Sequence, residues 1–417
     1  MSQVIMIGCD LHDGSMLLKI AEGRQTPDTR SFQNTTRGRA EMIAGLKRRA
    51  KAAGTERIVL VYEASGQGFG LYDQLVAAGI ECHVLAPTRI AHSPQQRKRK
   101  TDEQDALALL ELLRAHVLAG NALPAVWIPG PQTRDDREVV RQRLDVAEKL
   151  TATKTQIQSL LKRSQVARPA GLGKRWTKTY RAWLAHSLAE PLDATRSPLG
   201  SGARTALGSL LRQMKMLEEE VERLDKQLPN MAWSPRYEAA MRALTGMPGV
   251  GVLTALVFLT ELGDLRRFAN RRQLAAYLGV VPSSHESGKS GDRKGHITHQ
   301  GSPRVRKMLC QATWVRLRHD PEEKAAYERI RARNPKHKKI AVVASMRRLA
   351  ICLWHRGVAA AERTAADSPA TVRAAPQVLP ARSTTASPSD FRRHDKGVRG
   401  RREREVVPGM AVAVPGT

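Results

Sequence analysis

The sequence predicts a mixed α/β domain at its N-terminal end and a mainly helical remainder. Through about residue 117, short apolar runs rich in β-formers alternate with amphipathic stretches of helical period. From about residue 133 to 228 the pattern changes to long, charged helices with apolar residues three and four apart. A third region, from about 237 to 358, is again helical and is interrupted by glycine and proline turns.

The N-terminal elements follow in a recognisable order. A β-rich run at 3–9 ends at Asp10, and two further short strands are expected at 16–20 and 29–33. A helix at about 37–52 leads to an apolar strand that ends at Glu63. A helix (70–78), a strand (81–86) and a helix that Thr101 would cap complete the domain. Three strands, a helix, and then alternating strands and helices indicate an α/β layer of the ribonuclease-H type.

The helical insert has an a/d seam of three heptads. Its members are Leu207, Leu210, Met214, Leu217, Val221, Leu224 and Leu228. An earlier helix with Ala147, Leu150, Ile157 and Leu161 could pack on this seam within one chain. A coiled coil between two chains is the alternative, and the sequence does not choose between them.

The third region opens with LTGMPGVGVLTALVFL. A PGVG turn between two helices is similar to a helix-hairpin-helix, in which backbone N–H groups at a helix start hold a DNA phosphate, so Gly249 and Gly251 are candidate DNA contacts. A plain helix connector has the same pattern. Beyond about residue 360 the chain is rich in Ala, Pro, Ser, Thr and Arg without periodicity, which is typical of a disordered basic tail.

Charge indicates the class of partner. The chain has 69 Lys and Arg against 40 Asp and Glu, a formal net charge of +29. Such an excess favours a polyanion, that is a nucleic acid, over a small metabolite as the partner. Four scattered cysteines form no CxxC pair, and no apolar stretch has the ~20 residues of a spanning helix, so we expect a cytoplasmic, nucleoid-associated protein without a membrane partner.

Four carboxylates have a placement that predicts a metal centre. Asp10 and Glu63 each stand where a predicted strand ends, and Asp102 and Asp105 share one face of a helix start. Acids brought together in this way repel one another unless a cation lies between them, and hard oxygen ligands select Mg²⁺ or Mn²⁺. Two such ions can stabilise the attacking and leaving oxygens of a phosphodiester exchange. The adjacent run Arg97, Lys98, Arg99 and Lys100 would hold the DNA backbone beside them.

Several of these segments resemble one family. IGCDLH, VYEASG and RKRKTDEQDA resemble the RuvC-like domain of DEDD insertion-sequence transposases, and LTGMPGVG with the segment from FANRRQLAAYLG to RVRKML is similar to that family's C-terminal transposase domain. The resemblance covers about residues 3–350. It implies a RuvC-like catalytic domain (1–125), a helical coiled-coil region (130–232), a C-terminal transposase domain (235–358) and the tail (360–417).

The resemblance also implies residue roles. The family's acidic tetrad falls on Asp10, Glu63, Asp102 and Asp105, and its serine nucleophile, five residues after a proline, falls on Ser287 before a glycine. A non-coding bridge RNA that pairs with target and donor DNA is implied by the family alone. Two positions depart from the usual pattern: Glu286 replaces a common second serine, and His299 replaces a frequent lysine.

The residues around Ser287 suit an approach to DNA. Three glycines give the backbone freedom, and the expected phosphate contacts are Lys289, Arg293, Lys294, Arg304 and Arg306. A serine in such a segment also commonly makes a turn, and Ser283, Ser284 and Ser290 are rivals for the role.

Three functions remain open from the residues. They are a transposase or site-specific recombinase that rejoins strands, a RuvC-like structure-selective endonuclease that hydrolyses them, and a non-enzymatic DNA-binding protein. Recombination joins two duplexes, so a dimer or tetramer is expected.

Overall fold

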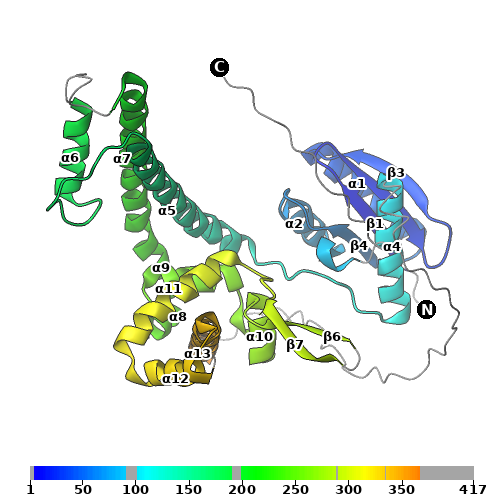
Figure 1. Ribbon diagram of the computed structural model, residues 1–417. Coiled ribbons are helices and arrows are strands. Elements are labelled where there is room, and N and C mark those ends of the chain that lie inside the picture. Colours follow the sequence, from blue (N-terminus) through cyan, green and yellow to red (C-terminus); the bar gives the residue numbers. More distant parts are fainter. Residues whose placement is uncertain (1–3, 91–100, 190–198, 288–289, 334, 367–417) are drawn as a thin grey trace, which may run out of the picture. The chain divides into compact units, whose positions relative to one another are not determined.

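The computed structural model describes residues 4–90, 101–189, 199–287, 290–333 and 335–366 (Figure 1). The basic run Arg97–Lys100, residue Lys289 and most of the expected tail lie outside these residues. None of the helices in these ranges is both long enough and apolar enough to cross a membrane.

A five-stranded mixed sheet forms the N-terminal part, in the order β3-β2-β1-β4-β5. Its strands are β1 (Ile5–Leu11), β2 (Ser15–Glu22), β3 (Asp28–Gln33), β4 (Ile58–Glu63) and β5 (Glu81–Leu85). The first three are antiparallel neighbours, whereas β4 runs parallel to both β1 and β5. Parallel pairing places the carboxyl ends of β1 and β4 at one edge of the sheet. The two strand-end acids therefore lie at the same edge although they are distant in the sequence.

Helices cover both faces of this sheet (Figure 1). Helices α1 (Thr36–Ala52) and α2 (Gly70–Ala77) pack on one face, around a core that includes Tyr62 and Leu60. Helix α4 (Asp102–Ala119) packs on the opposite face through Leu109, Leu110 and Leu113. A short 3₁₀ turn, Pro87–Arg89, follows β5. The element order agrees with the predicted mixed α/β domain and is consistent with a ribonuclease-H-like transposase fold.

A helical hairpin follows. Helix α5 (Pro131–Arg163) and helix α7 (Ser201–Ala232) pack on each other within one chain, and the shorter α6 (Lys178–Ala189) packs beside their outer ends (Figure 1). Leu207 and Met214 of the predicted seam are buried against α5 and α6, and Leu228 is buried at the base. Part of the predicted seam is therefore buried by contacts within the chain.

The C-terminal part is built on the base of that hairpin. Its helices are α8 (Glu238–Thr245), α9 (Val252–Leu262), α10 (Arg271–Leu278), α11 (Pro303–His319), α12 (Pro321–Arg333) and α13 (Lys338–Ala366), with a 3₁₀ turn at Leu265–Arg267. All of these helices except α12 share one hydrophobic core around α9, whose residues 254–262 are buried, with Val140 and Leu144 of α5. Helix α12 packs in a smaller cluster of Leu317, Tyr327 and Ala341. The core extends into the hairpin, so the base of α5 and α7 is fixed to these helices.

Two features differ from the expectations. The segment around Ser287, to which the sequence assigned no element, forms an antiparallel strand pair, β6 (Pro282–Ser287) and β7 (Ser290–Ile297), with two register irregularities. Helix α13 continues to Ala366, past the expected start of the tail at residue 360, because its AAAERTAA segment has high helix propensity and Ala360 is buried.

Candidate nuclease centre and DNA contacts

The first acid of the candidate centre, Asp10, lies one residue before the end of β1. Its neighbour Cys9 is in register with Tyr62 of β4, so Asp10 and Glu63 follow at the same edge of two parallel strands. Glu63 is the last residue of β4 and is half-buried. The predicted strand-end placement of these two acids therefore agrees with the structure.

Helix α4 brings the second pair of acids to this edge. Thr101 caps the helix by accepting a hydrogen bond from the backbone N–H of Gln104 at 3.3 Å, as the sequence predicted. Asp102 and Asp105 occupy its first turn. In addition to the larger effect of burial, the charges of both carboxylates raise the pKa of the Asp10 carboxyl. The positively polarised helix start also suits acidic residues.

A glycine in β1 allows this close approach of helix and strand. A Cβ built on Gly8 would lie 2.2 Å from the carbonyl oxygen of Ala106 and 2.4 Å from the backbone nitrogen of Leu110, both in α4. Only a residue without a side chain lets α4 rest directly on β1 here. Because side chains alternate across a strand, Gly8 and Asp10 share the face that α4 covers, and the helix start therefore lies above the carboxylate.

A lysine from the next strand also holds the first turn of α4. Lys19 in β2 is paired in register with Gly8. Its Nζ lies 2.9 Å from Oε2 of Glu103 and donates a hydrogen bond to Oγ1 of Thr29 at 2.7 Å. The lysine side chain is 13% exposed, so this ion pair is shielded on the lysine side and positions the acidic turn over the sheet.

His12 is a member of the cluster that sequence reasoning missed. Its Nε2 lies 3.0 Å from Oδ2 of Asp10 and 3.4 Å from Oδ1 of Asp102. Among the residues with defined positions, Asp10, His12 and Asp102 offer one ligand atom each within 4.8 Å of one another. The signal in the sequence was a histidine only two residues after Asp10, just beyond the last strand residue, Leu11.

The electrostatics of the cluster fit a cation. Burial raises the pKa of Asp10, and the charges of Asp102 and Asp105 raise it further, whereas His12 acts in the opposite direction. The charge of Asp10 in turn raises the pKa of His12. A half-buried carboxylate surrounded by other carboxylates and one imidazole is a set of donors that divalent metal ions bind. The residues present therefore offer a set of donors that fits a divalent cation.

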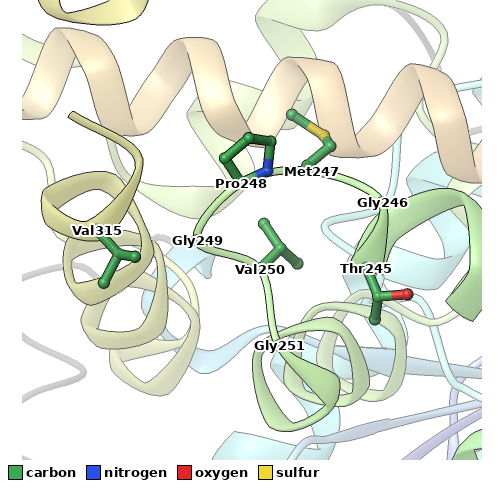
Figure 2. A pocket seen from close by; sticks show the side chains of 8 residues that line it. All are labelled: Thr245, Gly246, Met247, Pro248, Gly249, Val250, Gly251 and Val315. Atoms are coloured by element: carbon green, nitrogen blue, oxygen red, sulfur yellow. The ribbon is translucent and has the colours of Figure 1, made fainter. Parts of the chain in front are cut away.

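The second candidate region is the turn between α8 and α9. Figure 2 shows the loop from Gly246 to Gly251 around a hollow of about 620 Å³, with Val315 of α11 on its other side. Gly249 has φ +85°, and a Cβ there would lie 2.5 Å from the carbonyl oxygen of Ala312. Gly251 precedes the first residue of α9, and nothing lies within 4 Å of the Cβ position there. The loop thus packs tightly on α11 at one glycine and is open at the other.

The candidate nucleophile Ser287 is the last residue of β6, paired in register with Ser290 of β7. The side chains of residues 284–294 are not among the described ones, so the hydroxyl of Ser287 and the cations Arg293 and Lys294 stay predictions. The two arginines on α11 have intrachain partners. Arg304 donates to both carboxylate oxygens of Asp145 at 2.8 and 3.1 Å, and Arg306 donates to three backbone carbonyls. A DNA phosphate would have to compete with these contacts.

Comparisons with known proteins agree with this arrangement. A sequence profile for the DEDD transposases of IS110 matches residues 7–165, and a profile described as "Transposase IS116/IS110/IS902 family" matches residues 241–328. The chain is 32% identical to "Putative transposase y4qE" of Sinorhizobium fredii over 74% of this chain and 71% of the relative. It is 30% identical to "Putative transposase y4rJ" of the same organism over 75% and 80%.

A more distant relative carries the name of an insertion sequence. The transposase for IS1111A of Coxiella burnetii is 25% identical over 62% of this chain and 66% of the relative. The first profile spans the sheet, all four candidate acids and α5, and the second spans the α8–α9 turn and the segment of Ser287. This chain is a transposase of the IS110/IS116/IS902 family, with the DEDD domain at its N-terminal end.

Proposed function

We propose that this transposase cuts and rejoins DNA at the edge of its sheet, where Asp10, Glu63, Asp102 and Asp105 hold Mg²⁺ or Mn²⁺. One observation carries the proposal: ligand atoms of Asp10, His12 and Asp102, from two distant chain segments, lie within 4.8 Å of one another. Incidental helix caps and turn residues would not converge in this way. Bound divalent ions would supply positive charge to the attacking and leaving oxygens of the phosphodiester.

The chain's own residues prepare this centre. The Gly8 contact and the Lys19–Glu103 pair fix the first turn of α4 over β1, so the carboxylates are arranged before any ion binds. His12 lies between Asp10 and Asp102 and offsets part of their repulsion. The outcome is a preorganised cluster of carboxylates.

The metal centre is tested by the variant Asp10→Asn, with Asp13→Asn as its matched control. Asp13 is an exposed turn residue in the loop that follows β1, and it is outside the cluster. We expect Asp10→Asn to lose binding of Mn²⁺, measured by titration calorimetry, and to lose DNA cleavage, whereas Asp13→Asn keeps both. Equal Mn²⁺ affinity in wild type and Asp10→Asn would refute the proposed site.

We further propose that Ser287 is the nucleophile. Its oxygen forms a bond to phosphorus, the bond from phosphorus to the departing deoxyribose oxygen breaks, and the serine proton is transferred to that oxygen. The phosphoserine link retains the ester bond, so the reverse reaction with another strand end rejoins DNA without an external cofactor. Support comes from the family's serine position and from the place of Ser287 at the end of β6.

Covalent adducts on denaturing gels test this step. We expect Ser287→Ala to form none while binding DNA normally, and Ser290→Ala, at the first residue of β7, to form them at the wild-type level. Adducts that persist in Ser287→Ala would exclude this residue. Hydrolysed strands without any adduct in wild type would favour the structure-selective endonuclease.

Contacts to double-stranded DNA are proposed at the α8–α9 turn, as in a helix-hairpin-helix. The backbone N–H groups at the start of α9, beside Gly249 and Gly251, would hold a phosphate, and the open space at Gly251 allows a close approach. The runs Arg97–Lys100 and Lys289–Lys294 are proposed to hold the backbone near the two chemical centres. Loss of binding in Gly251→Glu, with the fold unchanged by circular dichroism, would support the turn as a contact.

A bridge RNA and a homo-oligomeric state are proposed from the family resemblance. Co-expression of the chain with the DNA that flanks its gene, followed by sequencing of co-purified RNA, tests the first. Light scattering of the RNA–protein complex tests the second. A complex that excises DNA without RNA would refute guidance by RNA.

A further inference from the structure

The outer end of the helical hairpin is a strongly basic segment that the proposed chemistry does not use. From residue 149 to 189 the chain has no Asp or Glu, although 40 acids in 417 residues would give about four in a stretch of 41. The same stretch has nine Lys and Arg. We call residues 149–189, which comprise the end of α5, the connecting segment and α6, the basic lobe.

Most of the positive charge of the basic lobe faces outward. Only Lys154 and Arg181 within it have a carboxylate partner in the described part of the chain, namely Glu218 of α7. The remaining cations beyond Ser159 are exposed and have no ion pair with a described residue: Lys162, Arg163, Arg168, Lys174, Arg175 and Lys178. An unbalanced group of six cations on one lobe indicates a surface that meets a polyanion.

The basic lobe is a fixed platform, because it has its own core. Ile157, Leu161 and Leu184 are buried there with Leu207 of α7. Thr177 caps α6 by accepting from the backbone N–H of Tyr180 at 3.3 Å. The cations at the ends of α5 and α6 therefore project from elements whose positions are set by packing.

Three aromatic rings hold the connecting segment in place. Trp176 packs edge-on against Tyr180 at 5.4 Å between ring centroids, and Tyr180 packs on Trp183 at 5.2 Å. Lys154 lies over the ring of Trp176 at 5.6 Å. Trp176 has φ +69°, a left-handed conformation that costs about 1–2 kcal/mol for such a residue and that these contacts stabilise.

The burial of these three rings indicates which kind of nucleic acid the basic lobe would bind. Proteins that bind single strands present aromatic faces on which bases stack. Here Tyr180 is 2% exposed and the two tryptophans are partly buried against their neighbours, so the aromatic surface belongs to the lobe's interior. Cations without a stacking surface suit the phosphates of a duplex.

A hollow between the hairpin helices extends the same surface. Its lining combines the apolar Leu160, Ala206 and Leu210 with uncharged polar residues and one cation, and it has no carboxylate; the polar residues are Thr155, Gln156, Ser159, Ser209 and Gln213, and the cation is Arg163. Hydroxyl and amide groups of this kind are common phosphate and sugar contacts. The hollow therefore adds hydrogen-bond donors to the charge of the basic lobe.

The basic lobe lies far from the core that anchors the hairpin. Leu144 of α5 belongs to the C-terminal core, and Lys162 is 18 residues further along the same helix, which corresponds to about 27 Å at 1.5 Å per residue. A duplex held at the lobe is thus held well away from the α8–α9 turn, which packs in that core.

We propose that the basic lobe is a separate DNA-binding surface of this transposase, which holds duplex DNA by its phosphates. Duplex DNA is favoured over duplex RNA because DNA is the polyanion on which the family acts. The exposed groups are lysines and arginines, and their contacts with phosphates carry no sequence information. The proposal does not depend on the metal centre or on Ser287.

The test compares two triple variants that remove three positive charges each. The lobe variant is Lys162→Gln/Lys174→Gln/Lys178→Gln. The control is Lys215→Gln/Arg223→Gln/Lys226→Gln, on α7 of the same hairpin, where each cation is exposed but paired with a glutamate three or four residues away. Thermal unfolding by circular dichroism checks that both fold, and Mn²⁺ titration checks the nuclease centre separately.

Affinity for a 30-base-pair DNA duplex is measured across salt concentrations. Each lost phosphate contact reduces the slope of log K against log[salt] by about 0.9, so three lost contacts reduce it by about 2.7. Between 50 and 200 mM salt, wild-type affinity should then fall roughly 40-fold more than that of the lobe variant. The control should keep the wild-type slope.

Three results would overturn the proposal. One is an unchanged slope in the lobe variant, and another is an equal loss in both variants, which would indicate a general effect of net charge. The third is a loss of affinity confined to an RNA duplex of equal length, which would assign the surface to RNA. A reduced slope for DNA in a folded, Mn²⁺-binding lobe variant would support it.

Discussion

Replacement of Gly8 by alanine tests whether close helix–strand packing builds the nuclease centre. The added Cβ would lie 2.2 Å from the carbonyl oxygen of Ala106, whereas ordinary contacts begin at 3.4 Å. The difference, 3.4 minus 2.2, means that α4 has to move away from β1 by about 1.2 Å. The obstacle is backbone, so no side-chain rotation can relieve it.

This movement has two measurable effects. Overpacking of this kind destabilises a fold by about 1–3 kcal/mol, which urea denaturation would detect. A displacement of about 1 Å in catalytic groups lowers rates by up to about 100-fold, and Asp102 and Asp105 move with α4. We therefore expect Gly8→Ala to weaken Mn²⁺ binding and to reduce DNA cleavage by one to two orders of magnitude, while the DNA affinity of the basic lobe is unchanged.

The matched control is Gly45→Ala in α1 of the same domain. The nearest atom to a Cβ there is the flexible end of Arg48 at 3.9 Å, so the space is open. Alanine inside a helix is more favourable than glycine by about 1 kcal/mol, so this variant should be as stable as wild type or slightly more. If Gly8→Ala had wild-type stability, Mn²⁺ affinity and cleavage rate, the contact between α4 and β1 would not be what positions the acids.

Three further changes test the C-terminal part. Gly249→Ala should destabilise it by about 1–3 kcal/mol in urea denaturation, because φ is +85° and the Cβ would meet an α11 carbonyl at 2.5 Å, whereas Gly251→Ala should cost less than about 1 kcal/mol; equal losses would contradict this. Burial alone would raise the pKa of Glu261, but the hydrogen bonds and the charge of Arg141 lower it overall. The Glu261–Arg141 pair therefore contributes fully to the free energy of unfolding above the pKa that the carboxyl has in the unfolded chain, and this contribution is lost as pH falls through the pKa in the folded chain. Glu261→Gln should cost about 3 kcal/mol at neutral pH and flatten acid unfolding monitored by circular dichroism; an unchanged acid transition would argue against the pair. Asn270→Ala, which removes a cap that accepts from two backbone N–H groups of α10, should cost about 1 kcal/mol by thermal unfolding, and no change would show that the cap is dispensable.

The N-terminal elements could be predicted because local pattern and tertiary structure agree there. Strands β1, β2 and β4 contain short apolar runs, and Thr101 has the sequence context of an N-cap. Strand ends fix the positions of Asp10 and Glu63, and a helix start fixes those of Asp102 and Asp105. The positions of the four acids along the chain follow from local sequence. Their convergence follows from the rule that neighbouring parallel strands end at a common edge of the sheet.

What the sequence did not disclose depends on distant partners. Gly8 reads as a neutral glycine in a strand, and its role appears only when the helix that approaches it, about 100 residues later, is known. The strands β6 and β7 are rich in Ser, Gly and His, which have no strand preference, so cross-strand pairing and not propensity defines them. The acid-free segment was visible in the sequence, but its exposure required the fold.

The position of α4 at the end of the N-terminal part has a consequence for incomplete chains. Half of the acidic set belongs to α4, the last helix of the N-terminal part, and that helix also covers the sheet face that includes Val59 and Val61. A nascent or truncated chain that stops before this helix has two carboxylates and an uncovered apolar face. Such a fragment has Asp10 and Glu63 but lacks Asp102 and Asp105 of the proposed centre, and it leaves Val59 and Val61 without the helix that buries them.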